Sequence, residues 1–277
     1  ARERSRLHLG DQPLLNLRQV LENEVGLRIF LSSLPSWLAG MYAYVADLGY
    51  CVQVNRKHPP DRQRFTMAHE YGHFLTSRHK PGLDYASEQG RKPPHERFAD
   101  AYAAGFLMPE TSIRRNFMEI ASSTGDFQVA DLCRLSNRYA VSVPAMALRL
   151  EQLGLIEKGT SDLLREKQFR PSLARAQLRL PPAAAEPQEL YPERYKYLAV
   201  QAFRQEKISE GQLARFLRTD RVRAREILAS CVTRAEIGST GEREIVELPF
   251  EWSLPSKALR PDSTSAKGVP GLAVAPA

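Results

Sequence analysis

The first third of the chain carries a hydrophobic pattern that changes from helical to strand-like. Apolar residues recur on one side of a helix over residues 11–24, and Gly26 would end that helix. Residues 27–30 and 41–45 are strand-like, and residues 50–55 alternate between apolar and polar side chains, as a half-buried strand does. The pattern predicts a helix followed by a small antiparallel sheet.

Helical spacing returns after the sheet and continues through most of the remaining chain. It predicts one helix around residues 62–75 and a second, alanine-rich helix over residues 95–107, which Pro109 would stop. Two further helices are predicted over residues 129–139 and 143–155. The predicted fold class is therefore α+β, with a small antiparallel sheet, a pair of helices beside it and an all-α region that resembles a helix-turn-helix.

The helices over residues 129–139 and 143–155 have the spacing of a helix-turn-helix, with Ser142 as the N-cap of the second. A helix that reads DNA needs polar or basic residues at its start. Val143 and Pro144 are poor base readers, so we favour a packing unit here over a DNA contact.

Shifts in composition divide the chain into four parts. A Pro- and Ala-rich linker spans residues 180–187, and helices follow over residues 193–206, from Ser209 and from about residue 220. The last residues are rich in Pro, Ser, Ala and Gly. We expect a first domain over residues 1–110, a helical region over 111–178, a second helical unit over 190–236 and a disordered tail over 255–277.

Charge and cysteine content place few limits on function. The net charge of +7 over 277 residues suits an acidic or DNA-bound partner, but it also suits a basic protein with neither. The three cysteines, Cys51, Cys133 and Cys231, form no C-x-x-C pair and are expected to be reduced thiols. The chain shows no apolar signal region and no run long enough to span a membrane. These features predict a cytoplasmic protein without a membrane partner.

The chemistry of the chain is concentrated in His69-Glu70-Tyr71-Gly72-His73, an H-E-x-x-H motif. Positions i and i+4 share one face of a helix, so the two imidazoles can bind one tetrahedral zinc ion, and Mn²⁺ or Fe²⁺ could use the same ligands. The carboxylate of Glu70 can take a proton from a water at the metal. The alternative is an ordinary helix with two buried or surface histidines.

A third metal ligand must come from outside this motif. Glu96 and Asp100 lie four residues apart on the alanine-rich helix and share a face. Glu96 could ligate the metal, and Asp100 could accept the free ring N–H of a ligating histidine. The alternative is a solvated acidic face near a helix N-terminus, where Glu is favoured in any case.

These motifs resemble the ImmA/IrrE metallopeptidases. The family pattern R-F-T-x-A-H-E-x-G-H matches residues 64–73, and its E-x-x-A-N/D element matches residues 96–100. The resemblance continues to Pro109, although Tyr102 stands where Phe is usual. It covers roughly residues 7–155, with weaker similarity to about residue 235.

The resemblance implies that residues 1–110 are a gluzincin-like zinc metallopeptidase domain. Members of the family cleave a dedicated helix-turn-helix repressor and so switch on stress, phage or mobile-element genes, and we expect a protein substrate of this kind. In longer relatives a charged segment like residues 1–8 follows an N-terminal DNA-binding domain. The chain could therefore be a piece of a longer protein.

The residue that stabilises the oxyanion of the peptidase reaction is left open by the sequence. His79, His95, Tyr71 and Tyr102 are the nearby candidates, and spacing distinguishes none of them.

The second helical unit is locally basic. Arg218, Arg221 and Arg225 would share one face if their helix were continuous, and with Arg215 they form a candidate docking surface for the substrate. An arginine-rich solvated face is commoner than a nucleic-acid site, so nucleic acid is the less favoured partner. Two other functions stay open: a DNA- or partner-binding regulator whose metal site is structural or vestigial, and a metal-dependent hydrolase of a non-protein substrate.

Overall fold

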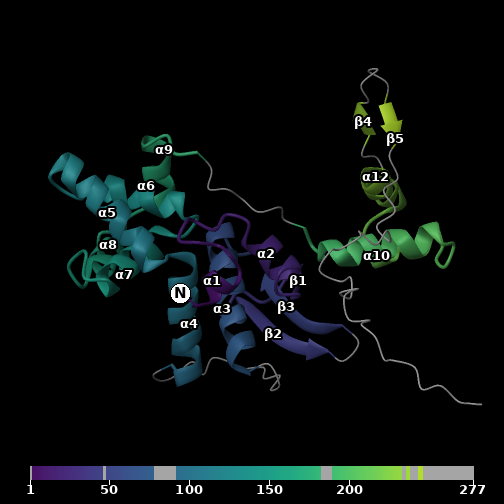
Figure 1. Ribbon diagram of the computed structural model, residues 1–277, viewed down its shortest axis with the longest axis horizontal. Helices are drawn as coiled ribbons and strands as arrows, with labels where there is room; N and C mark the ends of the chain where they lie inside the picture. The colour runs from purple at the N-terminus through teal and green to yellow at the C-terminus, as the bar shows by residue number, and fades with distance from the viewer. Residues whose placement is uncertain are drawn as a thin grey trace, which may run out of the picture. The chain divides into compact units, whose positions relative to one another are not determined.

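The computed structural model describes residues 2–45, 48–77, 92–181 and 189–232, together with the backbone of two short strands beyond them. The chain divides into two compact units, residues 1–209 and residues 210–277 (Figure 1). The expected tail over 255–277 and the candidate His79 lie outside the described residues. The finer four-part division stays a prediction.

Unit 1 contains three strands and ten helices among its described residues. In chain order these are α1 (Arg2–Arg6), α2 (Leu17–Asn23), β1 (Arg28–Ser32), β2 (Gly40–Val45), β3 (Gly49–Asn55), α3 (Pro60–Ser77), α4 (Pro94–Leu107), α5 (Glu110–Thr124), α6 (Val129–Arg138), α7 (Val143–Gln152), α8 (Thr160–Glu166), α9 (Pro171–Gln177) and α10 (Glu193–Arg204). Unit 2 contains α11 (Glu210–Phe216), α12 (Arg221–Val232), β4 (Ala235–Ile237) and β5 (Arg243–Ile245). The predicted α+β class is confirmed.

The sheet of unit 1 is mixed, and the prediction of an antiparallel sheet was wrong in this respect. The strand order is β1-β3-β2, with β2 antiparallel and β1 parallel to the central β3. The short connection from β2 to β3 makes these two strands an antiparallel hairpin. The connection from β1 to β2 leaves a gap between these strands, and β3 fills it and pairs with β1 in parallel. Alternation along β3 predicts a half-buried strand but not its neighbours.

Helix α2 is shorter than predicted because the backbone carbonyls of the residues before it accept hydrogen bonds from buried arginines. Arg4 donates to the carbonyl of Gln12, and Arg64 donates to the carbonyls of Leu14 and Leu15. Both guanidinium groups are buried, so these carbonyls satisfy donors that would otherwise lack partners. The segment stays irregular, and the helix begins only at Leu17.

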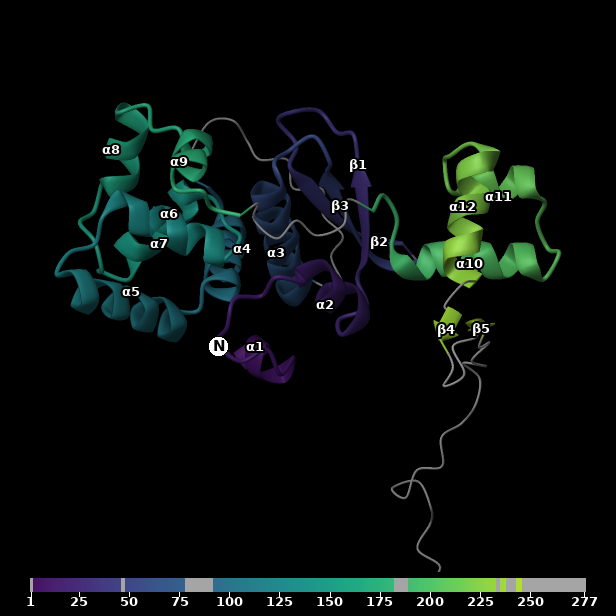
Figure 2. The same cartoon turned by 90° about the horizontal axis from the view of Figure 1, so that it is seen from above.

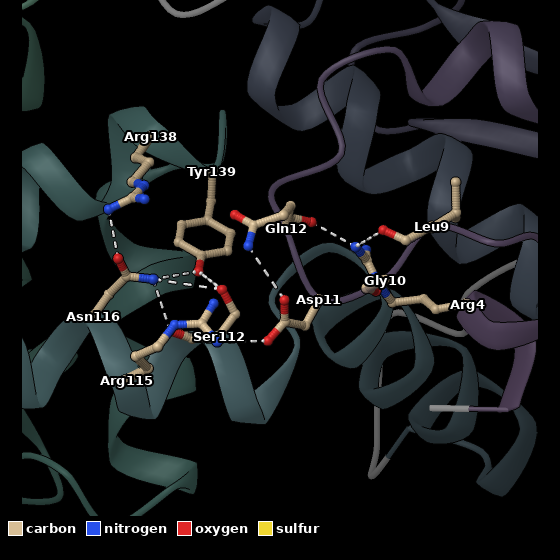
Figure 3. A network of polar contacts seen from close by, with 10 residues as sticks. All are labelled: Arg4, Leu9, Gly10, Asp11, Gln12, Ser112, Arg115, Asn116, Arg138 and Tyr139. Atoms are coloured by element: carbon tan, nitrogen blue, oxygen red, sulfur yellow. Dashed lines mark hydrogen bonds and ion pairs between the residues drawn. The ribbon is translucent and has the colours of Figure 1, made fainter.

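A polar network joins the N-terminal segment to α5 and α6 (Figure 3). The Tyr139 hydroxyl lies 2.5 Å from Ser112 Oγ and accepts from Asn116 Nδ2 at 3.0 Å, and all three residues are buried. Arg115 pairs with Asp11 at 3.0 Å. The network ties the chain's start to the helices that follow the candidate metal site.

The pair α6 and α7 is a packing unit, as expected. The Ser142 hydroxyl caps α7 by accepting from Ala145 N at 3.2 Å, which confirms the predicted N-cap. Val143, at the start of α7, is fully buried. Arg64 donates to the carbonyl of Ala140 in the turn before it, so this turn faces the core.

The outer edge of β1 is covered by the segment that precedes α10. The Leu31 N–H donates to the Leu190 carbonyl at 3.0 Å. The buried guanidinium of Arg18 donates to the carbonyls of Glu189 and Tyr191. Removing the chain after about residue 158 would therefore expose the edge of β1. It would also remove two carbonyl acceptors from the buried guanidinium group of Arg18. Point variants are the cleaner way to test what the C-terminal helices do.

No helix in the described part of the chain combines the length and apolar character that a membrane span needs.

Candidate metal centre

Two helices pack side by side to form the candidate site (Figure 1, Figure 2). Gly72 of α3 faces Ala99 of α4, and a Cβ built at Gly72 would lie 3.1 Å from Ala99 Cα and 3.3 Å from the Tyr102 ring. Gly72 thus gives room to the backbone of α4, which brings Glu96 within reach of the histidines.

This contact predicts opposite responses at two helical glycines. Gly105→Ala should stabilise the chain by up to about 1 kcal/mol, because Ala favours a helix and the nearest atom to its Cβ is the end of the Arg149 side chain at 3.9 Å. Gly72→Ala should lose that gain, since its methyl group meets a backbone atom of α4. Urea unfolding of both variants measures the difference. Equal stabilisation at the two positions would show that the helices can separate without cost.

Three ligand atoms converge between α3 and α4. His69 Nε2 and His73 Nε2 lie 3.0 Å apart. Glu96 Oε2 lies 3.2 Å from His69 Nε2, and Glu96 Oε1 lies 3.1 Å from His73 Nε2. All three side chains are largely shielded from solvent. Among the described residues they form one group that could hold a metal ion.

The spacing and chemistry of these atoms fit a divalent cation. Ligands about 2.0–2.1 Å from a tetrahedral zinc ion are separated from one another by about 3.3 Å. The measured separations of 3.0–3.2 Å are close to that value. Two imidazole nitrogens and one carboxylate oxygen also form a donor set that zinc commonly uses, with a fourth position left for solvent or substrate.

Asp100 orients the first histidine. Its Oδ1 lies 3.0 Å from His69 Nδ1, which places the ring proton on Nδ1 and leaves Nε2 free to face Glu96. Lys92 donates to Asp100 Oδ2 at 2.7 Å. Burial raises the pKa of Asp100, but the hydrogen bonds from His69 and Lys92 outweigh this and hold the pKa below its ordinary value. Asp100 thus contacts both His69 and Lys92, and nothing in the sequence spacing pointed to Lys92.

Asp100 variants should weaken metal binding in a graded way. Asp100→Ala removes the acceptor for His69 Nδ1–H, and loss of such a partner typically costs about 10–100-fold in metal affinity. Asp100→Asn should be milder, because the amide oxygen can still accept this N–H. Competition with a chromogenic chelator measures both. A chain that no longer folds as Asp100→Asn would make this residue structural.

Glu70 lies in the buried layer between α3 and the start of β2. A Cβ built at Gly40 would lie 3.4 Å from Glu70 Oε1 and only 2.5 Å from Thr66 Cγ2. Only a glycine lets β2 pass this close to the carboxylate. Burial raises the pKa of Glu70, the positive charge of His69 lowers it and the negative charge of Glu96 raises it, and the result is about 7. A carboxyl group of this kind can exchange a proton near neutral pH.

The raised pKa predicts a pH-dependent stability for the metal-free chain. Glu70 is favourable when protonated, so its contribution is complete below its ordinary pKa of 4.5 and is lost as the pH rises through about 7. That interval corresponds to roughly 3 kcal/mol. In chelator, the wild-type chain should lose about this much more stability than Glu70→Gln between about pH 4 and pH 8. Parallel stability curves for the two proteins would show that Glu70 is not desolvated.

Two of the oxyanion candidates point away from the ligands. The Tyr71 hydroxyl donates to Glu3 and also lies 3.3 Å from Arg6, so it is bonded to α1. The Tyr102 hydroxyl is buried and has no hydrogen-bond partner among the described residues, while its ring stacks on Phe106. Burial raises the pKa of both tyrosines.

The third described candidate lies close to the ligands. His95 Nε2 is 3.9 Å from Glu96 Oε1, and its ring packs near that of His73. Of the described candidates, His95 alone is placed near the site.

Comparison with known families agrees with this geometry. The peptidase family described as the IrrE N-terminal-like domain matches residues 22–151. Residues 22–151 therefore carry a domain of the ImmA/IrrE family. No curated protein matches the chain. The ImmA/IrrE match runs from α2 through α7, so it contains all three ligand residues, Glu70 and Asp100. It supports a metallopeptidase-type function for this part of the chain.

The arginines of the second helical unit lie outside the ImmA/IrrE match. The helix on which their common face depended is interrupted: Arg218 lies between α11 and α12 with a φ of +45°. Arg225 forms a two-pronged ion pair with Glu210 at 2.9 and 3.1 Å. The condition of a continuous helix, on which a common face of Arg218, Arg221 and Arg225 depended, is therefore not met, although Arg215, Arg218 and Arg221 are all exposed.

Proposed function

We propose that this chain is a zinc endopeptidase that cleaves a partner protein. The observation that carries the proposal is a buried carboxyl group, Glu70, which follows His69 in α3 and interacts electrostatically with His69 and Glu96, two of the three ligand residues. A structural metal site needs no neighbouring base. The buried Glu70 therefore favours catalysis over a regulator whose metal site is structural or vestigial.

Each residue of the candidate metal centre has a separate role in the proposed peptide hydrolysis. His69, His73 and Glu96 would hold the cation, which would lower the pKa of a water toward neutrality and polarise the scissile carbonyl. Glu70 takes the proton as the water attacks and then gives it to the leaving amine. Asp100 and Lys92 hold His69 in the orientation that directs Nε2 to the site. Mn²⁺ or Fe²⁺ would suit the same donors.

An extended peptide fits the surroundings of Glu70. Within the described sheet, β2 is paired only with β3, so its other edge can accept a strand. A Cβ built at Gly40, at the start of β2, would lie 3.4 Å from Glu70 Oε1, so this strand passes close to the carboxylate. A tightly folded core cannot lie against a strand edge, so we expect the cut to fall in a loop or frayed segment of the partner.

A helix-turn-helix repressor is the partner that the family resemblance favours. The test is to incubate the purified, zinc-loaded chain with candidate repressors encoded beside it, and to locate new termini by mass spectrometry. One repressor should be cut at a single loop, and a chelator should stop the reaction until zinc is restored. If denatured casein is cut but every repressor stays intact, the chain is a peptidase with another substrate. If neither is cut, the peptidase proposal is wrong.

A further inference from the structure

The two helices of unit 2 have the local geometry of a helix-turn-helix. Helix α11 has seven residues, and residues 217–220 join it to the twelve-residue α12. Arg218 in this connection has a left-handed backbone, and the Thr219 N–H donates back to the Ala214 carbonyl at 2.9 Å. Asp220 then caps α12 by accepting from Arg223 N at 2.8 Å. The chain therefore ends one helix, turns within four residues and starts the next.

Small and apolar residues hold these helices together. Leu213, Ala214 and Leu217 are buried on α11 and its end, and Ala224 is fully buried on α12. Ala214 and Ala224 allow the two backbones to approach closely, and Figure 2 shows α11 and α12 next to one another. This short hydrophobic seam leaves the start of α12 outside the core.

The exposed start of α12 separates this pair from α6 and α7. In that earlier pair the turn is also left-handed, at Ala140, but Val143 at the start of the second helix is fully buried. At the corresponding first position of α12, Arg221 is exposed, and Val222 after it has 66% of its surface accessible. A recognition helix must present its N-terminal residues in this way to enter a groove.

The charges around this end suit a polyanion. Arg221 lies at the start of α12, Arg215 on α11 and Arg218 in the turn, and all three are exposed. None of the three forms an ion pair with another described residue. Arg225 is instead held by Glu210, which fixes its guanidinium one turn further along α12. An exposed apolar side chain between arginines is the combination that base edges and phosphates contact in the major groove.

We propose that α11 and α12 bind duplex DNA, with the start of α12 in the major groove. Arg221 and Val222 would face base edges, and Arg215 and Arg218 would contact phosphates on either side. Duplex DNA is favoured over a protein partner because the exposed N-terminal end of α12, which follows a tight turn, has the shape that enters a major groove. This proposal is independent of the metal site and of the peptidase activity.

The test is fluorescence anisotropy of the full-length chain with a labelled mixed-sequence duplex of about 30 base pairs, between about 50 and 200 mM salt. The wild-type chain should bind at low salt with an affinity that falls as salt rises. The double variant Arg215→Ala, Arg218→Ala should bind about 10-fold more weakly at low salt, and its salt slope should be smaller by about 2. Arg221→Ala should also relax the sequence preference recovered from a random duplex pool.

A second double variant controls for charge. Lys158→Ala, Lys167→Ala removes the same net charge from exposed positions in unit 1, and it should bind the duplex like the wild type. Circular dichroism should show unchanged helix content in all variants, because the substituted side chains are exposed. Equal weakening in the two double variants would overturn the proposal, as would no duplex binding at low salt. Tighter binding to a single-stranded RNA, or loss only of repressor binding in the arginine variant, would also overturn it.

Discussion

Glu70→Gln should lower the rate of substrate cleavage by about 10²–10⁴-fold, the usual effect of removing a general base. Gln fills nearly the same space between α3 and Gly40 but cannot accept the proton of the attacking water. None of the three ligand atoms belongs to Glu70, so metal content should not change. Single-turnover cleavage of the identified substrate, at equal metal content, measures the effect.

Glu110→Gln is the matched control for this experiment. Glu110 is an exposed carboxylate on α5, paired with Arg114, and it lies outside the site. Its variant should cleave at the wild-type rate. If Glu70→Gln also cleaved at that rate while holding the same amount of metal, another group would have to take the proton.

Glu96→Ala should abolish tight metal binding, with a loss of affinity beyond the roughly 100-fold that a supporting residue can cost. It removes one of the three ligand atoms, whereas Asp100→Ala only removes support from His69. His73→Ala should have a comparable effect, because the ligand set is then reduced to two. Equilibrium dialysis against a buffered zinc series measures the affinity of each variant.

His95→Ala tests whether the histidine before Glu96 could supply the third ligand in its place. His95 lies next to Glu96 in sequence, but its Nε2 is 3.9 Å from the nearest Glu96 oxygen. We expect His95→Ala to keep its zinc. If His95→Ala lost zinc and Glu96→Ala kept it, the ligand assignment would be reversed.

The helices of the site follow from local pattern, and this is why they could be predicted. The i, i+4 spacing of His69 and His73 needs only a helix, and Glu96 and Asp100 need only the next one. How the two helices meet depends on Gly72 and Ala99, which are 27 residues apart and have no spacing relation. Their contact became evident only once both backbones were placed.

Long-range polar contacts were the part that local pattern could not predict. Arg18 binds the carbonyls of Glu189 and Tyr191, which are 171 and 173 residues away in the sequence. Tyr71 donates to Glu3, which is 68 residues away. The parallel pairing of β1 with β3 is of the same kind, because alternation along a strand does not name its neighbour. The continuous helix that a common face of the three arginines required is absent for a local reason instead. Arg218 adopts a left-handed backbone that separates α11 from α12.

The most direct test of the proposed site is an anomalous diffraction map at the zinc absorption edge, from crystals of the zinc-loaded Glu70→Gln chain. The proposal predicts one zinc ion per chain, about 2.0–2.2 Å from His69 Nε2, His73 Nε2 and a carboxylate oxygen of Glu96. Residue 70 should lie beside the ion without ligating it. A zinc ion bound through other side chains, or Glu96 turned away from an ion held by the two histidines, would contradict the proposed site.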